Sequence, residues 1–254
     1  MFGYAAEPTP RIWIFNGLPG DDEHHQFFEK NLADIRKSLV VHFKIPPQNI
    51  SVLYGPKEAG YDGAATRQNI LSEFEKIVAY GKSASTSPVW IIFQGHANRI
   101  PGDANLNLPG PDLSATDIAR ALKDFPAETP LVILATTTAA SDFLRALSAP
   151  GRIIISATEQ LDPISETDFP EALAAILAEK GTDADNNNDI SALEIFRACQ
   201  ERVLKIYESG GFMVREHAQL DGNGDGKGTQ RPAPEDAEPA SKISLKIPKE
   251  TRFD

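Results

Sequence analysis

The sequence predicts an α/β fold, namely a three-layer αβα sandwich built on a mostly parallel sheet. Short runs rich in β-branched and aromatic residues alternate along the chain with longer segments whose apolar residues recur at helical spacing. The runs Val89–Gln94 and Leu131–Ala135 are almost continuously apolar. Such runs are typical of parallel strands that helices cover on both faces.

The first part of the chain supplies three strands and two helices. Strands are expected at Arg11–Asn16, 49–54 and Val89–Gln94. A helix is expected over 21–43, with Asp21 or Asp22 at its N-cap. A second helix should follow Thr66, whose hydroxyl suits an N-cap.

The remaining elements continue the same alternation. A Gly-, Pro- and Asn-rich loop is expected at 100–111, and Ser114 should cap a helix that reaches Leu122. The expected elements beyond it are a strand at Leu131–Ala135, a short helix at 141–147, a strand at 152–157, a helix at 168–179, and a polar loop from 182 that leads into a helix ending near 207.

The domain organisation is expected to be simple. Residues 10–229 form one domain, preceded at 1–9 by an extension that could be the remnant of a signal peptide. Residues 230–254 are rich in Pro, Ala, Glu and Lys and are expected to form a flexible C-terminal tail. No apolar run approaches the roughly 18 residues that a membrane span needs.

Charge and cysteine content narrow the function classes. The chain has 36 acidic residues against 25 Lys and Arg, a net charge of −11. Such a chain repels phosphate backbones, so nucleic acid is not an expected partner. A single cysteine excludes internal disulfides and zinc–cysteine clusters. That residue, Cys199, lies in a helical stretch and is expected to be a buried core thiol.

A histidine directly follows the most apolar strand. Gly95 and His96 come after Gln94, and catalytic groups of α/β sheets gather at the carboxyl ends of strands. His96 is therefore a candidate general base, and the alternative is a loop histidine without a role. The sequence predicts that His24, His25 and His42 are surface residues.

The motifs around this histidine resemble a known family. They are the Gly-His turn, the segment Asn-Leu-Pro-Gly-Pro-Asp-Leu at 107–113, and Gly-Arg-Ile-Ile-Ile-Ser-Ala-Thr at 151–158. Over residues 10–230 the chain resembles bacterial members of the legumain-type (clan CD) cysteine peptidases, which have the caspase/hemoglobinase fold. Asn16 and Gly17 are similar to the Asn-Gly that legumains place beside their catalytic dyad.

The resemblance implies a His–Cys dyad, but the cysteine is missing. Aligned on Phe143, the family's nucleophile falls on Thr138. A hydroxyl is far less acidic than a thiol, and Thr is stiff at χ1. The expected function is therefore a catalytically inactive pseudopeptidase that binds a peptide or protein in the former substrate cleft. The alternative is an active hydrolase in which His96 is the base and Thr138 or Ser141 supplies the nucleophile. Glu166 and Asp168 follow the fifth strand, where the family builds its substrate pocket, without an assigned role.

The segment 183–194 fits a twelve-residue calcium loop of the EF-hand type. Oxygen ligands are expected from Asp183, Asp185, Asn187, the main-chain carbonyl of Asp189, Ser191 and Glu194. Position six holds Asn188 where Gly is standard, and Asn tolerates the left-handed conformation. The alternative is a polar connection without metal. Calcium would be structural, and no organic cofactor is expected.

A second acidic loop begins in the same way. Asp221, Asn223 and Asp225 occupy positions one, three and five, but position twelve is Pro232. Weak calcium binding and a Gly-rich turn remain open for this loop. A weak calcium site would fit best where calcium is millimolar, which favours an extracytoplasmic location, periplasmic or secreted. The oligomeric state is not readable from the sequence.

Overall fold

A seven-stranded sheet forms the centre of the molecule. The computed structural model describes residues 9–56, 60–83, 87–160, 162, 166–179 and 182–248. The sheet order is β11-β9-β8-β4-β1-β2-β3. All neighbours are parallel except β11 and β9. In that order the strands are Gln219–Asp221, Arg152–Ser156, Leu131–Ala135, Val89–Gln94, Arg11–Asn16, Ile50–Tyr54 and Gly63–Ala64.

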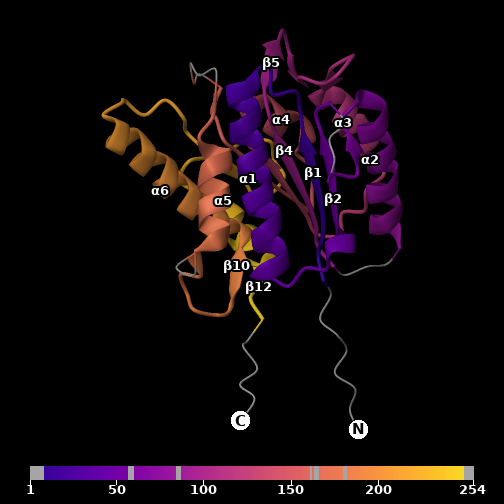
Figure 1. Ribbon diagram of the computed structural model, residues 1–254. Coiled ribbons are helices and arrows are strands. Elements are labelled where there is room, and N and C mark those ends of the chain that lie inside the picture. Colours follow the sequence, from indigo (N-terminus) through magenta and orange to yellow (C-terminus); the bar gives the residue numbers. More distant parts are fainter. Residues whose placement is uncertain are drawn as a thin grey trace.

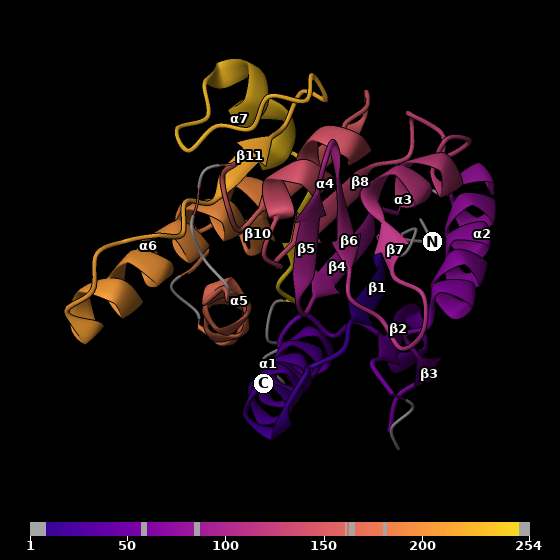
Figure 2. The same cartoon turned by 90° about the horizontal axis from the view of Figure 1, so that it is seen from above.

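Helices cover both faces of this sheet (Figures 1 and 2). On one face, α1 (Asp22–Val41) packs beside α5 (Phe169–Ala178), and α6 (Ala192–Gly210) packs against α5. The other face carries α2 (Arg67–Lys82), α3 (Ala115–Ala121) and α4 (Ala140–Leu147). The predicted three-layer αβα class is therefore confirmed.

The central strands are buried along their whole length. Ile92 of β4 lies opposite Ile14 of β1 and Leu134 of β8, and all three side chains are covered. Burial of apolar surface on both faces is the main favourable term for such a sheet. The predicted N-caps Asp21, Thr66 and Ser114 each accept a hydrogen bond from a main-chain N–H in the first turn of their helix.

The expected loop at 100–111 is partly a β-hairpin. Strands β5 (Ala97–Ile100) and β6 (Asp103–Leu106) pair antiparallel around Gly102, and β7 (Leu113–Ser114) adds to β6. The prediction failed because Gly, Asn and Pro dominate this composition. Ala104 and Leu106 nevertheless alternate with half-buried polar residues, and this period of two matches a half-buried strand.

The predicted flexible tail is wrong for the residues up to 248. Helix α7 (Pro234–Ser241) leads into β12 (Ser244–Lys246), which pairs antiparallel with β10 (Asp189–Ser191). Ala240 and Leu245 are buried. Besides these two residues, Ala237, Ile243 and Ile247 pack partly buried against the core. Pro at the first helical position starts α7. Residues 249–254 and most of the predicted extension at 1–9 lie outside the described residues.

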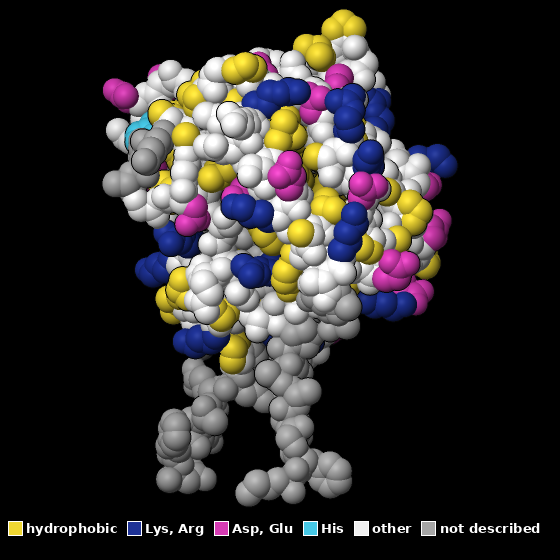
Figure 3. Space-filling view, turned by 90° about the vertical axis from the view of Figure 1, so that its right-hand side faces the viewer, with side chains coloured by type: hydrophobic (Ala, Val, Ile, Leu, Met, Phe, Trp, Pro, Cys, Tyr) yellow, Lys and Arg dark blue, Asp and Glu magenta, His cyan; other side chains and the backbone are white. Residues whose placement is uncertain are grey.

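Three further observations concern the burial of Cys199, membrane-spanning helices and the surface beside α2. Cys199 is fully buried in α6, as predicted, and burial raises the pKa of its thiol well above the usual value. None of the helices in the described ranges is both long and apolar enough to cross a bilayer. On the side that carries α2, basic, acidic and apolar side chains are interspersed (Figure 3).

Candidate functional site

The carboxyl ends of β1 and β4 bring two tight turns into contact. Gly17 N–H donates to the carbonyl of Gln94 at 2.9 Å. Gly95 has φ +115°, and a Cβ on it would lie 3.0 Å from the nitrogen of Gly17. Only glycine meets both conditions without strain. This contact sets the position of His96, the next residue.

The imidazole of His96 is held by a main-chain carbonyl. Its Nε2 lies 3.0 Å from the oxygen of Pro19. A carbonyl can only accept, so Nε2 carries the proton of this hydrogen bond. Nδ1 is then the basic nitrogen of the neutral ring, and no described residue forms a hydrogen bond to it.

The hydroxyl of Thr138 is bonded twice to the main chain of Ala97. It donates to the carbonyl of Ala97 at 2.6 Å and accepts from the Ala97 N–H at 3.0 Å. Thr138 and His96 line the same two cavities. Among the described residues, no hydrogen bond joins the two side chains. The Thr138 hydroxyl instead connects the segment after β8 to Ala97, the first residue of the hairpin.

The other predicted polar groups lie apart from this pair. Ser141 is buried at the start of α4, receives a hydrogen bond from Arg99 at 3.3 Å, and lines neither cavity of His96. Asn16 is fully buried, and its Nδ2 donates to the carbonyl of Gly17 at 3.1 Å. Asn16 therefore supports the turn beside His96 and does not face a cavity.

His24, predicted to be a surface residue, keeps a partly exposed side chain and also lies beside His96, which the sequence did not predict. Its ring contacts the ring of His96 edge-on, with centroids 4.8 Å apart. Nε2 lies 2.7 Å from a carboxylate oxygen of Glu166, and Nδ1 lies 2.7 Å from Asp21. The hydrogen bond to Glu166 and then the one to Asp21 raise the pKa of His24, which favours the imidazolium. The Asp21–His24 spacing was visible in the sequence, but the contact with Glu166, 142 positions away, was not.

A cavity of about 180 Å³ opens between α1, the Gly-His turn and the start of α5. Aromatic rings and carboxyl groups share its wall. Its lining residues are Glu23, His24, Phe27, Phe28, Gly95, His96, Thr138, Glu166, Thr167 and Asp168. Asp168 makes no side-chain cap on α5, and the pKa of its carboxyl is raised by burial and by the neighbouring Glu171 and Glu166.

Behind this wall lies a second buried carboxyl group. Glu216 accepts hydrogen bonds from the main-chain N–H groups of Asp168 at 2.7 Å and Phe169 at 3.0 Å. It therefore supplies the acceptor at the N-terminus of α5 that Asp168 does not supply. Burial, together with the charges of Asp168 and Asp162, outweighs these hydrogen bonds and raises the pKa of Glu216 to about 8.

On the other side of His96 and Thr138 is an open cavity of about 370 Å³. Arg99, Asn98 and Asn107 line it, and Asp162 closes its far end. The Arg99 guanidinium pairs with the buried carboxylate of Asp142, which also pairs with Arg145. His96 and Thr138 line both cavities.

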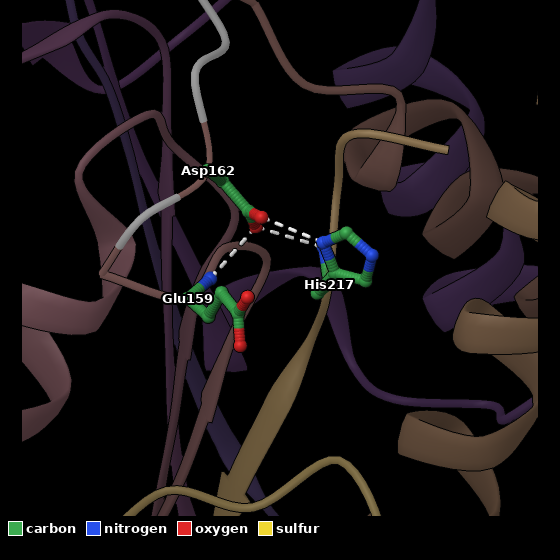
Figure 4. Close-up of side chains that lie close together, drawn as sticks. All are labelled: Glu159, Asp162 and His217. Atoms are coloured by element: carbon green, nitrogen blue, oxygen red, sulfur yellow. Dashed lines mark hydrogen bonds and ion pairs between the residues drawn. The ribbon is translucent and has the colours of Figure 1, made fainter. Parts of the chain in front are cut away.

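Glu159, Asp162 and His217 lie close together beside the second cavity (Figure 4). Asp162 accepts from Nδ1 of His217 at 2.6 Å, from the His217 N–H at 2.9 Å and from the Glu159 N–H at 2.8 Å. Although one ligand atom from each residue could meet at a metal ion, these hydrogen bonds already engage Asp162. These hydrogen bonds join the segment after β9 to the residues just before β11, so we interpret the group as structural.

The loop at 183–194 brings three carboxylates of the predicted calcium loop close together. Carboxylate oxygens of Asp183, Asp185 and Glu194 lie within 4.8 Å of one another. Asp183 accepts from the N–H groups of Asn187 and Asn188, both at 3.0 Å. Asn188 has φ +68°, the left-handed conformation that glycine usually supplies at position six. The donor set of hard oxygens fits calcium.

In the second acidic loop, the carboxylate at position one belongs to Asp221 and holds a turn. Asp221 is fully buried, and its oxygens accept from Gly224 N–H at 2.8 Å, Gly226 N–H at 3.0 Å and the Ser148 hydroxyl at 2.6 Å. The loop containing Asn223 and Asp225 brings no group of three carboxylates together among the residues the structure describes. It has the features of a turn held by Asp221.

Comparison with known proteins identifies the fold and no family. No protein-family model matches the sequence, and no curated protein sequence matches it significantly. A crystal structure of a protein from Geobacter sulfurreducens is similar over 95% of this chain and 100% of its own, with TM-score 0.53 and 13% identity. A secreted C11 cysteine protease from Bacteroides thetaiotaomicron, bound to an irreversible peptide inhibitor, has TM-score 0.44 and 11% identity, over 80% of this chain and 59% of its own. The first similarity shows a shared α/β fold, and at these identities nothing about activity follows from either.

Proposed function

We propose that this protein is a non-hydrolytic member of the legumain-like peptidase fold that binds a peptide or protein ligand in the cavities beside His96. The observation that carries this proposal is the double hydrogen bond between the Thr138 hydroxyl and the main chain of Ala97. A nucleophile needs a free lone pair and a base that takes its proton. Here the proton of the hydroxyl is donated to a carbonyl, and His96 forms no hydrogen bond with it.

The alternative hydrolase has less support. Ser141 lines neither cavity of His96, and Nε2 of His96 donates to Pro19. The one thiol of the chain, Cys199, is buried in α6 with a raised pKa, so it supplies no thiolate. The cavities themselves remain open, which is what a binding role requires.

Covalent labelling tests this proposal. A fluorophosphonate probe and a peptide acyloxymethyl ketone should leave the wild-type protein unlabelled. Thr138→Cys should restore a thiol beside His96, and the ketone should then label it in a manner that His96→Ala abolishes. Thr138→Ser is the matched control, because it keeps the hydroxyl clamp. Labelling of the wild type that disappears in His96→Ala would contradict the pseudopeptidase proposal.

We also propose that the loop at 183–194 binds structural calcium. Three carboxylates within 4.8 Å of one another and the left-handed Asn188 support this. A ligand that binds only the folded state raises its stability. Calcium at about 1 mM should therefore raise the melting temperature relative to EDTA, and Asp183→Asn should remove the shift. An identical transition in calcium and EDTA would contradict it. A weak site of this kind would support the extracytoplasmic location expected above.

A further inference from the structure

The C-terminal end of α6 projects from the side of the molecule and carries exposed apolar side chains (Figures 1 and 2). None of the residues 204–210 is buried. Five large apolar side chains are exposed in the described part of the chain, and three of them lie here: Leu204 at 41%, Phe212 at 72% and Met213 at 79%. Single exposed apolar residues are ordinary, but a cluster of this kind is typical of a surface that another molecule covers.

A cavity of about 400 Å³ lies beside this cluster, between α6 and the segment that leads into β11. Gln200 holds the two walls together, because its Nε2 donates to the carbonyl of Ala218 at 3.2 Å and to that of Gln230 at 3.1 Å. No lining residue is shared with either cavity beside His96, so the two sites are distinct. The apolar part of the lining comes from Val203, Leu204, Val214 and Ala218.

The uncompensated charge around this cavity is positive, although the whole chain carries −11. Arg197 and Arg231 line the cavity and are exposed, and neither side chain forms an ion pair or hydrogen bond with a described residue. Of the two acids in the lining, Glu201 pairs with Lys205, and Glu216, whose pKa is about 8, is largely protonated at neutral pH. Free guanidinium groups pair best with carboxylates, through parallel hydrogen bonds.

The main chain along one wall of the cavity also has free hydrogen-bonding groups. The N–H groups of residues 213–216 donate to no described residue. A main chain with unpaired N–H and C=O groups is a template to which an extended peptide can add as a strand. Because the apolar cavity lies directly beside these groups, one side chain of such a peptide can enter it while the peptide main chain bonds to the wall.

Two other occupants of this surface fit less well. An anionic lipid bilayer would attract the two arginines, but a membrane surface does not use the free main-chain groups, and the net charge of −11 opposes the approach of the whole protein. A second copy of the chain carries the same unpaired arginines and the same net charge, so its approach is opposed by like charge.

We propose that the groove formed by α6 and residues 213–218 docks an extended acidic segment of a partner protein. The segment places one apolar side chain in the cavity, pairs carboxylates with Arg197 and Arg231, and forms main-chain hydrogen bonds with residues 213–216. Phe212 and Met213 lie at the end of this groove and enlarge the apolar contact. Because the groove is separate from the cavities beside His96, this docking does not depend on the function proposed above.

Fluorescence polarisation with rhodamine-labelled peptides tests the proposal. The acidic probe is Gly-Glu-Leu-Glu-Leu-Glu-Gly. Lysine replaces each glutamate in the basic probe, and serine replaces each leucine in the polar probe. The acidic probe should bind at least about tenfold more tightly than either of the others. Arg197→Gln and Arg231→Gln should each weaken its binding about threefold. Leu204→Ser should weaken it by a similar factor, because apolar contact is lost. Hydrogen exchange at residues 213–216 should slow in the complex.

Two control variants change similar side chains outside the groove. Lys123→Gln removes an exposed positive charge, and Val41→Ser removes an exposed apolar side chain. Both should leave the affinity for the acidic probe unchanged. All the substituted side chains are exposed, so the variants should keep the melting temperature of the wild type, which checks that they fold.

Several outcomes would overturn the inference. They are equal affinity for the acidic and basic probes, no binding of the acidic probe, or unchanged hydrogen exchange at residues 213–216. Binding to phosphatidylserine vesicles without binding to the acidic probe would assign the surface to a lipid. A dimer in sedimentation velocity that Met213→Ser dissociates would assign it to a second copy. Binding that His96→Ala abolishes and Arg231→Gln leaves intact would place the probe beside His96, which overturns this inference and supports the function proposed above.

Discussion

An acidic region lies beyond each end of α5, and the two regions differ in the hydrogen bonds that their carboxylates accept. Beyond its C-terminal end, in the loop at 183–194, the carboxylates of Asp183 and Glu194 accept main-chain hydrogen bonds. At its N-terminal end, the Asp168 carboxylate accepts no hydrogen bond from a described residue, and Glu216 accepts two main-chain N–H groups but is buried near other acids. The two regions therefore differ less in their number of acids than in the hydrogen-bond donors that hold those acids in place.

The largest expected effect concerns Glu216. Its folded-state pKa of about 8 lies above the ordinary value of 4.5, so the folded state holds its proton more tightly than the unfolded state. Stability from this group is therefore complete below about pH 4.5 and is lost as the pH rises towards 8. The loss is on the order of 4 kcal/mol.

Glu216→Gln should remove that pH dependence. Urea unfolding from pH 5 to 9 should show a smaller decline in stability for the variant than for the wild type. Glu128→Gln, at an exposed position, serves as the control. If the free energy of unfolding of wild type and of Glu216→Gln depended on pH in the same way, Glu216 would not be protonated in the folded protein at neutral pH. The two acidic regions would then differ less in the protonation of their carboxyl groups.

A smaller effect is expected in the calcium loop. Glu194 accepts from Ala184 N–H at 2.9 Å and closes the capping box of α6 with Ser191. Glu194→Ala should lower the calcium-free stability by about 2 kcal/mol and abolish stabilisation by calcium. Glu201→Ala, which removes an exposed carboxylate on the same helix, should leave stability close to that of the wild type. Equal losses in both variants would show that the loop is not pre-shaped by its carboxylates.

The smallest effect concerns Lys246, a cation that pairs with a loop residue. Lys246 on β12 pairs with the carboxylate of Asp189 at 2.5 Å, and the lysine side chain is 59% exposed. Lys246→Ala should cost about 1 kcal/mol without calcium, and less at high salt. Because a positive charge leaves the loop, calcium should then stabilise the variant more than the wild type, as thermal melts with and without calcium would measure. Lys205→Ala, at an exposed pair on α6, is the control. A weaker calcium effect in Lys246→Ala would indicate that β12 acts on the loop through its pairing and not through charge.

The parts of the candidate site that depend on local sequence patterns were predictable. The strand ends fixed by apolar runs placed His96 and Thr138 at one edge of the sheet, and the loop spacing placed Asp183 near Glu194. The hairpin at 97–106 and the packed segment up to 248 were missed, because composition was judged without the neighbours that bury Leu106 and Leu245.

Sequence alone determined the alternation of strands and helices, the caps, and the absence of a cysteine at position 138, since these depend on local periodicity and residue identity. Only the tertiary structure decided that Thr138 is clamped to Ala97 and that His24 bridges Asp21 and Glu166 beside His96. It also decided that no described residue donates a hydrogen bond to the carboxylate of Asp168. The physical reason is that hydrogen-bond satisfaction and desolvation depend on groups brought together from distant parts of the chain, which local periodicity does not encode.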